Sequence, residues 1–375
     1  MKITVVRPEE LGPGESERWR EIQRATPGLV HPFLGPEFAA AVGRHRAQAR
    51  VAVLEDGSRI VGFFPFEQRS LGLGVPIAAG LTTCQGMVYE PDLGWDPQQL
   101  LRACGLAAWE FDFLVSGQGA FESSVVHRAP SPVMDLRAGF EQYVAGLKAV
   151  SPGLAKDVRR KQRKLERDVG EVGFVFDSGD HDALRTLMSW KSAQYQRTGR
   201  VDRFTQPWIS ALLDDLLNIR TDSFSSVLCL LSAGGELVAG HLLLRMDDVL
   251  AGWFPSYDTR FSRYSPGTVT RMRTAQVAAG EGVALIHMGA SVKNEYKQAF
   301  KSHDVFVGEG RVLRASPAAA VHWLRRAPVR RVRLAVAERP ALVRMADRAL
   351  HRYGQMRTAL AAPRRVDQRV SEGIS

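Results

Sequence analysis

The sequence has few cysteines and no metal-binding pattern. Its three cysteines, Cys84, Cys104 and Cys229, lie far apart and form no CxxC motif. This usage excludes a disulfide framework and suits a reducing compartment. The nine histidines show no ligand spacing such as HExxH, so we expect no metal site.

Long apolar runs are also missing. A membrane-spanning helix needs roughly 18 or more consecutive apolar residues, and no such run occurs. The first residues, MKITVVRPEELG, lack an apolar h-region and a cleavage site, so we expect no secretory signal. These absences predict a cytoplasmic protein. Its 375 residues, 45% of them apolar, are enough for two domains with substantial cores.

The net charge of +10 is distributed unevenly along the chain. Residues 311–375 contain 15 arginines, no lysine and four acidic residues, which gives this segment a charge of +11. The remaining chain carries 35 basic and 36 acidic residues and is nearly neutral. The pI near 9.8 therefore describes an Arg-rich extension and does not predict that the whole protein binds nucleic acid.

Within this extension, residues 340–358 predict a cationic amphipathic helix, with apolar positions such as Leu342 and Leu350 set against Arg344, Arg348 and others. Such a helix could lie on the anionic inner face of a membrane, pack on the body of the protein or bind RNA. The sequence leaves these three roles open.

A second cationic segment covers residues 153–168, where ten of sixteen residues are charged. One interpretation is a solvated helix with Leu154, Val158 and Leu165 facing inward. The other is an electropositive rim for an anionic substrate or for phosphates.

The two halves of the chain repeat one order of elements: a helix, an FxxP motif, a second helix, and two strands around a glycine turn. Phe33-x-x-Pro36 corresponds to Phe204-x-x-Pro207, and the strands flank Gly57 in one half and Gly235 in the other. The shared order indicates an internal duplication.

Residues 248–300 predict a strand, a polar loop, a helix, a strand and a helix. The loop ends in Ser265-Pro266-Gly267, which has the composition of a helix start with Ser265 as N-cap. A helix N-terminus presents free N–H groups and the positive end of the helix dipole, which suits a diphosphate. An ordinary, well-capped connection would show the same composition.

Residues 228–300 resemble the CelD-like branch of the GNAT acyltransferases, whose members tend to be associated with polysaccharide or cell-envelope biosynthesis. The matching residues are Gly240, Tyr257-Asp258, Ser265-Pro266-Gly267, Gly282 and Tyr296-Lys297-x-x-Phe300, with Arg159-Arg160-x-x-Arg163-Lys164-Leu165-Glu166 and Trp190-Lys191 upstream. The usual GNAT signature Q/R-x-x-G-x-G/A is altered, because Arg263 to Gly267 contains one residue too many and Val269 replaces the second glycine.

The resemblance covers about residues 15–310. It implies an α/β (α+β) fold with two tandem GNAT-like mixed sheets flanked by helices, an architecture shared with the Fem-type peptidyltransferases. Residues 1–150 would form a degenerate half, residues 151–310 the half with the acyl-CoA site, and residues 311–375 a basic helical C-terminal extension with a disordered end.

The resemblance also implies an acyl-CoA donor, and acyl transfer from a thioester needs donor anchoring, carbonyl polarisation and two proton transfers. We expect the helix start to hold the donor phosphates, with Arg260 or Arg263 adding a charge-assisted contact. The candidate donor-binding residues are Arg260, Arg263, Ser265, Pro266, Gly267 and Thr268.

For the chemistry, Asp258 is the candidate base, or else a loop cap. Tyr257 or Tyr296 would protonate the leaving thiolate, and Lys297 would pair with phosphate or with Asp258. Trp190 and Lys191 would line the acceptor pocket. His241, inside an apolar strand pattern, is expected to be a buried core histidine.

The predicted function is direct transfer of an acyl group from acyl-CoA to an amino or hydroxyl group of a sugar or lipid-linked cell-envelope precursor. No Gly-x-Ser-x-Gly motif supports a covalent intermediate. The predicted partners are that acceptor and an anionic membrane surface, contacted through 340–358, and not nucleic acid. Two alternatives remain: a Fem-type transferase that uses aminoacyl-tRNA, and a non-catalytic scaffold for envelope biosynthesis.

Overall fold

The computed structural model describes residues 1–290 and 295–315. The predicted helix at 340–358 and the rest of the Arg-rich extension beyond Ala315 lie outside this range.

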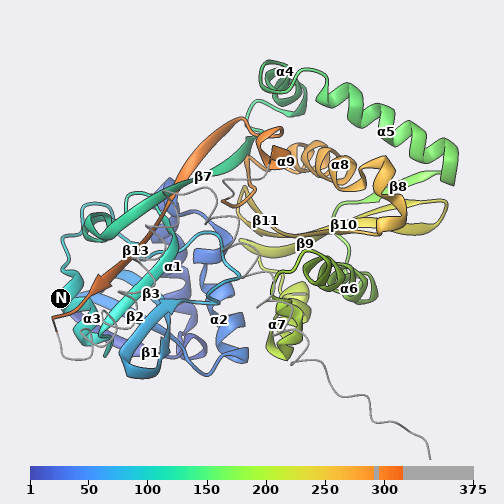
Figure 1. Ribbon diagram of the computed structural model, residues 1–375. Helices are drawn as coiled ribbons and strands as arrows, with labels where there is room; N and C mark the ends of the chain where they lie inside the picture. Colours follow the sequence, from blue (N-terminus) through green and yellow to red (C-terminus); the bar gives the residue numbers. More distant parts are fainter. Residues whose placement is uncertain (291–294, 316–375) are drawn as a thin grey trace, which may run out of the picture.

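A single mixed sheet of 13 strands runs through both halves of the described chain (Figure 1). Its order is β1-β2-β3-β4-β6-β13-β7-β12-β11-β10-β9-β8, and β5 pairs with β3. The mixed α/β class is confirmed. The two sheets expected from the resemblance are instead one continuous sheet.

The elements of the first half alternate between short helices and mostly antiparallel strands. They are β1 (Lys2–Val6), α1 (Pro13–Ala25), η3 (Pro32–Leu34), α2 (Pro36–His45), β2 (Ala49–Asp56), β3 (Arg59–Arg69), β4 (Leu73–Pro76), β5 (Val88–Tyr89), α3 (Pro97–Ala103), β6 (Ala108–Val115) and β7 (Val125–Asp135).

The second half begins with two helices that have no counterpart in the first. Its elements are α4 (Phe140–Val150), α5 (Leu154–Val169), β8 (Val172–Val175), α6 (His181–Arg197), η6 (Arg203–Thr205), α7 (Pro207–Asn218), β9 (Phe224–Ala233), β10 (Glu236–Met246), β11 (Val249–Tyr257), η7 (Thr259–Tyr264), α8 (Pro266–Gly280), β12 (Leu285–His287), α9 (Glu295–Gln298) and β13 (His303–Leu313).

The repeated order of elements is confirmed. The run α1-η3-α2-β2-β3 of the first half matches α6-η6-α7-β9-β10 of the second. Each half also contains one parallel strand pair, β4 with β6 and β11 with β12. The FxxP motif has the same place in both halves, because Pro36 begins α2 and Pro207 begins α7, and one residue separates each proline from a short 3₁₀ turn.

The halves are joined through the sheet itself. Strand β13, from the end of the described chain, pairs with β6 on one side and β7 on the other. Strand β7 in turn pairs with β12. Hydrogen bonds thus cross the boundary expected at residue 150, while that division remains a prediction.

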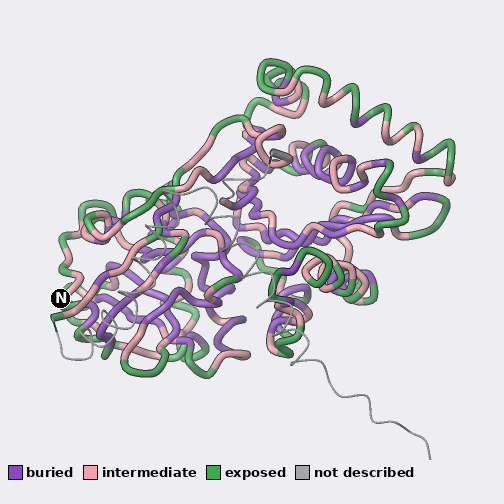
Figure 2. The backbone as a smooth tube through the Cα atoms, viewed as in Figure 1, coloured by how far each residue is buried: buried purple, intermediate pink, exposed green. Residues whose placement is uncertain are grey.

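Helices cover both faces of the second half of the sheet. Helices α8, α9, α4 and α5 lie on one face, and α6 and α7 lie on the other (Figure 1). The core under α6 and α7 continues into the first half, where Phe33 and Phe38 pack edge-on against Trp253. Figure 2 shows α8 and the strands largely buried and α5 largely exposed.

Helix α5 follows the first interpretation of its sequence. Val158 and Leu165 are buried, while most of its charged residues are exposed. Within the described ranges, no helix is both long and apolar enough to cross a membrane.

Candidate active site

The sheet opens at the parallel pair of the second half. Strands β11 and β12 pair from Val249 to Ala251, opposite Leu285 to His287. Strand β11 then continues to Tyr257, but over this stretch its only described strand partner is β10. A bulge at Trp253 marks the point where the strands diverge, since Leu242 and Leu243 pair with Phe254 and Gly252. The edge of β11 beyond Ala251 therefore offers backbone groups to an extended ligand.

Helix α8 begins beside the end of this edge. Ser265 has left-handed backbone angles (φ 51°, ψ 54°) and occupies the N-cap position, but its side chain makes no capping hydrogen bond. Ser265 is thus the N-cap residue, as predicted, but without the side-chain hydrogen bond that such a residue usually makes. Instead the Ser265 carbonyl oxygen accepts from the amides of Thr268 and Val269, at 2.9 and 3.3 Å. Because Pro266 has no N–H, only the Gly267 amide in this turn lacks an acceptor among the described residues.

Two tyrosines flank that amide. The Tyr296 hydroxyl, from α9, donates a hydrogen bond to the Gly267 carbonyl oxygen. A Cβ atom added to Gly267 would lie 3.5 Å from this hydroxyl and 3.9 Å from Cδ1 of Tyr257. The hydroxyl of Tyr257 makes no hydrogen bond to a described residue. The glycine thus leaves a narrow gap between the two rings.

Arg271 lies one turn further along α8. It is only 5% exposed, and its Nε has no hydrogen-bond partner in the described structure. Its guanidinium lies over the rings of Tyr296 and Phe300, 4.8 and 5.7 Å from the centroids. A buried guanidinium with an unused donor is ready to bind an anion.

Lys297 of α9 is the second cation here. Its Nζ donates to the Gly289 carbonyl oxygen at 3.0 Å. Burial lowers the pKa of Lys297 to about 8, assisted by the positive charges of Arg271 and Lys191. A sizeable fraction of this amine is therefore neutral near physiological pH.

Lys191 reaches the opening from α6, on the other face of the sheet. Its Nζ donates to Gln194 Oε1 at 2.9 Å and to the carbonyl oxygen of Pro255, on the open part of β11, at 3.1 Å. Burial, with Arg200 nearby, lowers the pKa of Lys191 to about 8. Its predicted companion Trp190 instead packs partly buried against the core under α6 and α7.

His241 of β10 completes this group. It is 4% exposed, and burial together with Arg271, Lys191 and Lys297 holds its pKa well below the usual value. Its imidazole is therefore neutral at pH 7. We name Lys191, His241, Arg271 and Lys297 the basic cluster. No carboxylate of a described residue forms an ion pair with any of them, and each lysine is stabilised mainly by neutral acceptors.

The predicted carboxylate lies in a different setting. Asp258 caps η7, accepting from the amide of Arg260 at 2.9 Å, and pairs with the Arg260 guanidinium at 2.8 Å. Arg260 also contacts Glu236 at 3.2 Å. Arg263 stacks over Tyr264, at 4.7 Å. Both arginines are thus engaged within the protein, and Lys297 does not pair with Asp258 in the described structure.

The structure thus brings Tyr257, Gly267, Tyr296 and Lys297 together, as expected, and places Lys191 on the adjoining strand edge. Two residues of the cluster were not assigned to the site from the sequence. Arg271 could have been found from its i+4 spacing after Gly267, which puts both on one helix face. His241 gave no such signal, because an apolar strand pattern is equally typical of a core histidine.

Comparisons with known proteins agree with this geometry. Residues 153–298, from α5 to α9, match the family model of an acetyltransferase (GNAT) domain. No curated protein matches the sequence. Among solved structures, the chain is similar to FemX, with 10% identity and a TM-score of 0.55 over 83% of this chain and 96% of that one. It is also similar to the C-terminal domain of a putative lysylphosphatidylglycerol synthetase from Agrobacterium fabrum, with 14% identity, a TM-score of 0.50, and 82% and 96% of the two chains covered.

At these identities the structural matches show a shared fold alone. The family match concerns the segment that contains the sheet opening, the start of α8 and the basic cluster. The chain therefore contains a GNAT acetyltransferase domain at residues 153–298, and the reaction class of such a domain is acyl transfer.

Proposed function

We propose that this protein transfers an acyl group from acyl-CoA to an amino or hydroxyl group of a sugar or another cell-envelope precursor. The acyl-CoA donor, the acceptor class and the CelD-like branch of the family come from the sequence resemblance. The observation that carries the proposal is the opening between β11 and β12, with the Gly267 amide and the basic cluster beside it.

The residues at the start of α8 fit a diphosphate. The Gly267 amide is unused, the helix dipole adds positive potential, and the buried Arg271 has an unpaired Nε. Among the described residues, only one amide of this turn lacks an acceptor, so Arg271 would supply charge that an ordinary glycine-rich turn supplies through further N–H groups. Arg260 and Arg263 are less suited to this role, because both already have partners within the protein.

Lys297 is the best-placed base. Its lowered pKa gives it a neutral form, and the hydrogen bond to Gly289 fixes its amine within the cluster. Lys297 would take the proton that the acceptor nitrogen or oxygen loses as it attacks the thioester carbonyl. Asp258 is less suited, because its carboxylate already caps η7 and neutralises Arg260.

The carbon–sulfur bond then breaks, and the leaving thiolate needs a proton. Tyr257 is the candidate donor, because its hydroxyl has no partner among the described residues and its ring lies beside Gly267. Tyr296 is already bonded to the Gly267 carbonyl, so we assign it the positioning of the helix start. Lys191 would orient the acceptor along the open edge of β11.

A second candidate is a Fem-type transferase that takes its acyl group from aminoacyl-tRNA. The cationic helix α5 favours it, because Lys161 of α5 donates to the carbonyl of Arg263 at 2.8 Å and so holds the helix beside the α8 start. The phosphate backbone of an aminoacyl-tRNA bound near the site would contact this positive surface.

A thermal-unfolding screen separates the candidates. Coenzyme A, acetyl-CoA, longer acyl-CoAs and aminoacyl-tRNA are each added, and a ligand at about 100 times its Kd should stabilise the fold by roughly 2.7 kcal/mol. Stabilisation by an acyl-CoA supports our proposal. Stabilisation by aminoacyl-tRNA alone would replace it with the second candidate, and no response to either would favour a non-catalytic scaffold.

A further inference from the structure

A groove of about 490 Å³ lies between α4, α5 and α8, on the side of α8 that faces away from the sheet. This volume falls within the range of small-molecule sites, roughly 300–1,000 Å³. Its apolar lining residues include Phe140, Val144, Val158 and Met272. All of its charged lining residues are cationic.

Three arginines line this arginine groove: Arg159 and Arg163 of α5 and Arg273 of α8. Among the described residues, no carboxylate lines the groove and none pairs with Arg159 or Arg163. Arg273 donates to Gln276 at 3.2 Å, but its Nε is buried without a partner. Elsewhere on α5, Arg160 and Arg167 pair with neighbouring aspartates, so the groove contains arginines that are left uncompensated.

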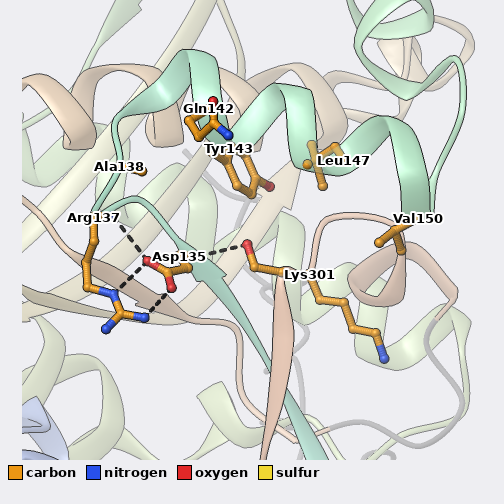
Figure 3. A pocket seen from close by; sticks show the side chains of 10 residues that line it. Asp135, Arg137, Ala138, Gln142, Tyr143, Leu147, Val150 and Lys301 are labelled. Atoms are coloured by element: carbon orange, nitrogen blue, oxygen red, sulfur yellow. Dashed lines mark hydrogen bonds and ion pairs between the residues drawn. The ribbon is translucent and has the colours of Figure 1, made fainter.

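A hollow of about 390 Å³ along α4 shows the contrast (Figure 3). Its charges are balanced within the protein. Arg137 bonds to Asp135 at 2.9 Å, and Lys301 points away from them and pairs with Asp304 at 2.5 Å. The charges that line that hollow are paired within the described protein, whereas the groove carries three cations without a carboxylate partner: Arg273 is half-buried, and Arg159 and Arg163 are exposed. This concentration of unpaired positive charge attracts an anion.

We propose that the arginine groove binds one anionic phospholipid. The three guanidinium groups hold its phosphate, and the first part of an acyl chain lies along Phe140, Val144 and Met272. Arginine forks match phosphate oxygens, and burial of apolar surface favours a chain over water. Phe140 is the single aromatic residue among those that line the groove, so the groove offers RNA bases few stacking faces.

The test uses the full chain and a short-chain lipid below its micelle concentration, so that no membrane surface is present. Dihexanoyl phosphatidylglycerol is titrated by calorimetry against the wild type, against the groove variant R159Q/R163Q/R273Q, and against a control, K148Q/K156Q/K164Q. The control removes the same charge from α4 and α5 but alters no residue that lines the groove. Circular dichroism and thermal unfolding verify that each variant folds, and R163Q alone replaces the triple variant if that one does not.

We expect the groove variant to weaken binding at least tenfold and the control to change it less than twofold. Dihexanoyl phosphatidylcholine lacks the net negative charge, and glycerol 3-phosphate lacks the acyl chains. Each should bind at least tenfold more weakly than dihexanoyl phosphatidylglycerol. Equal losses in both variants would overturn the proposal in favour of general electrostatic attraction. Equal binding of glycerol 3-phosphate would indicate a plain phosphate site.

Coenzyme A is titrated in the same way. If it displaces the lipid and loses affinity in the groove variant, the groove belongs to the donor site and the lipid proposal is wrong. If the lipid binds as expected and coenzyme A does not bind at all, the groove assignment stands while the proposed function fails.

Discussion

The hydroxyl of Tyr296 donates a hydrogen bond to the carbonyl oxygen of Gly267, and so ties the short helix α9 to the first turn of α8. This contact joins the helix that precedes strand β12 in the sequence to the helix that follows it. It also orients the peptide unit that follows the one free amide of the turn.

Replacing Tyr296 with phenylalanine should therefore affect donor binding. Loss of the hydrogen bond should lower the free energy of unfolding by about 1 kcal/mol and raise the Kd for coenzyme A severalfold. Tyr143 is a matched control, because its hydroxyl donates a hydrogen bond of 2.7 Å to the carbonyl oxygen of Phe300. This bond does not involve the start of α8. Tyr143→Phe should cost similar stability and leave the Kd unchanged. Equal effects of both variants on the Kd would show that Tyr296 has no special role.

Lys297→Met should stabilise the protein at pH 7 while abolishing transfer. The pKa of Lys297 falls from 10.5 to about 8 on folding, so the folded state binds this proton less tightly than the unfolded state. The resulting destabilisation is full below pH 8 and is relieved as the pH rises from about 8 to 10.5. Urea unfolding of the wild type and of Lys297→Met should show that the variant's larger free energy of unfolding at pH 7 comes closer to that of the wild type at pH 10. Lys156→Met, on the exposed side of α5, is the control, and a constant difference for Lys297→Met would contradict the pKa argument.

Arg271→Met should raise the pKa of Lys297. The guanidinium is, after burial, the main cause of the lowered value, so its removal should move the midpoint from about 8 toward 10.5. The measurement is an NMR titration of lysine labelled with ¹³C at Cε. Arg273→Met is the control, because it removes an arginine from the side of α8 that faces α5. It should leave the titration midpoint of Lys297 unchanged. An unmoved midpoint in Arg271→Met would mean that the two cations do not interact.

The hairpin turns and helix starts were predictable from the sequence because each depends on a few neighbouring residues. The turns at Asp56-Gly57 and Gly234-Gly235 predicted two hairpins, and Pro207 and Pro266 marked helix starts that the structure confirms. Strands β7 and β13 were missed. Strand β7 contains Pro130 and Pro132, residues that usually argue against an inner strand, and its partner β13 lies more than 160 residues away in sequence.

The candidate site was only partly predictable for a similar reason. Gly267, Tyr257, Tyr296 and Lys297 lie within one continuous unit, and their proximity follows from its order of elements. The basic cluster draws on α6, β10, α8 and α9, and no sequence pattern shows that these four meet. The unused Gly267 amide and the partners of Asp258 and Arg260 depend on atomic geometry that composition does not reveal.

The central claim is that the first turn of α8 holds the diphosphate of an acyl-CoA, and a calorimetric titration of acetyl-CoA into Gly267→Ala tests it most directly. An added Cβ makes ordinary contacts with Tyr296 and Tyr257, so the variant should fold at least as stably as the wild type, yet it fills the gap beside the free amide. Gly280→Ala, at the other end of the same helix, meets nothing within 4 Å and is the control. We predict a loss of affinity of roughly tenfold, or 1.4 kcal/mol, for Gly267→Ala and none for Gly280→Ala. Unchanged affinity in a folded Gly267→Ala protein, or no binding to the wild type, would contradict the claim.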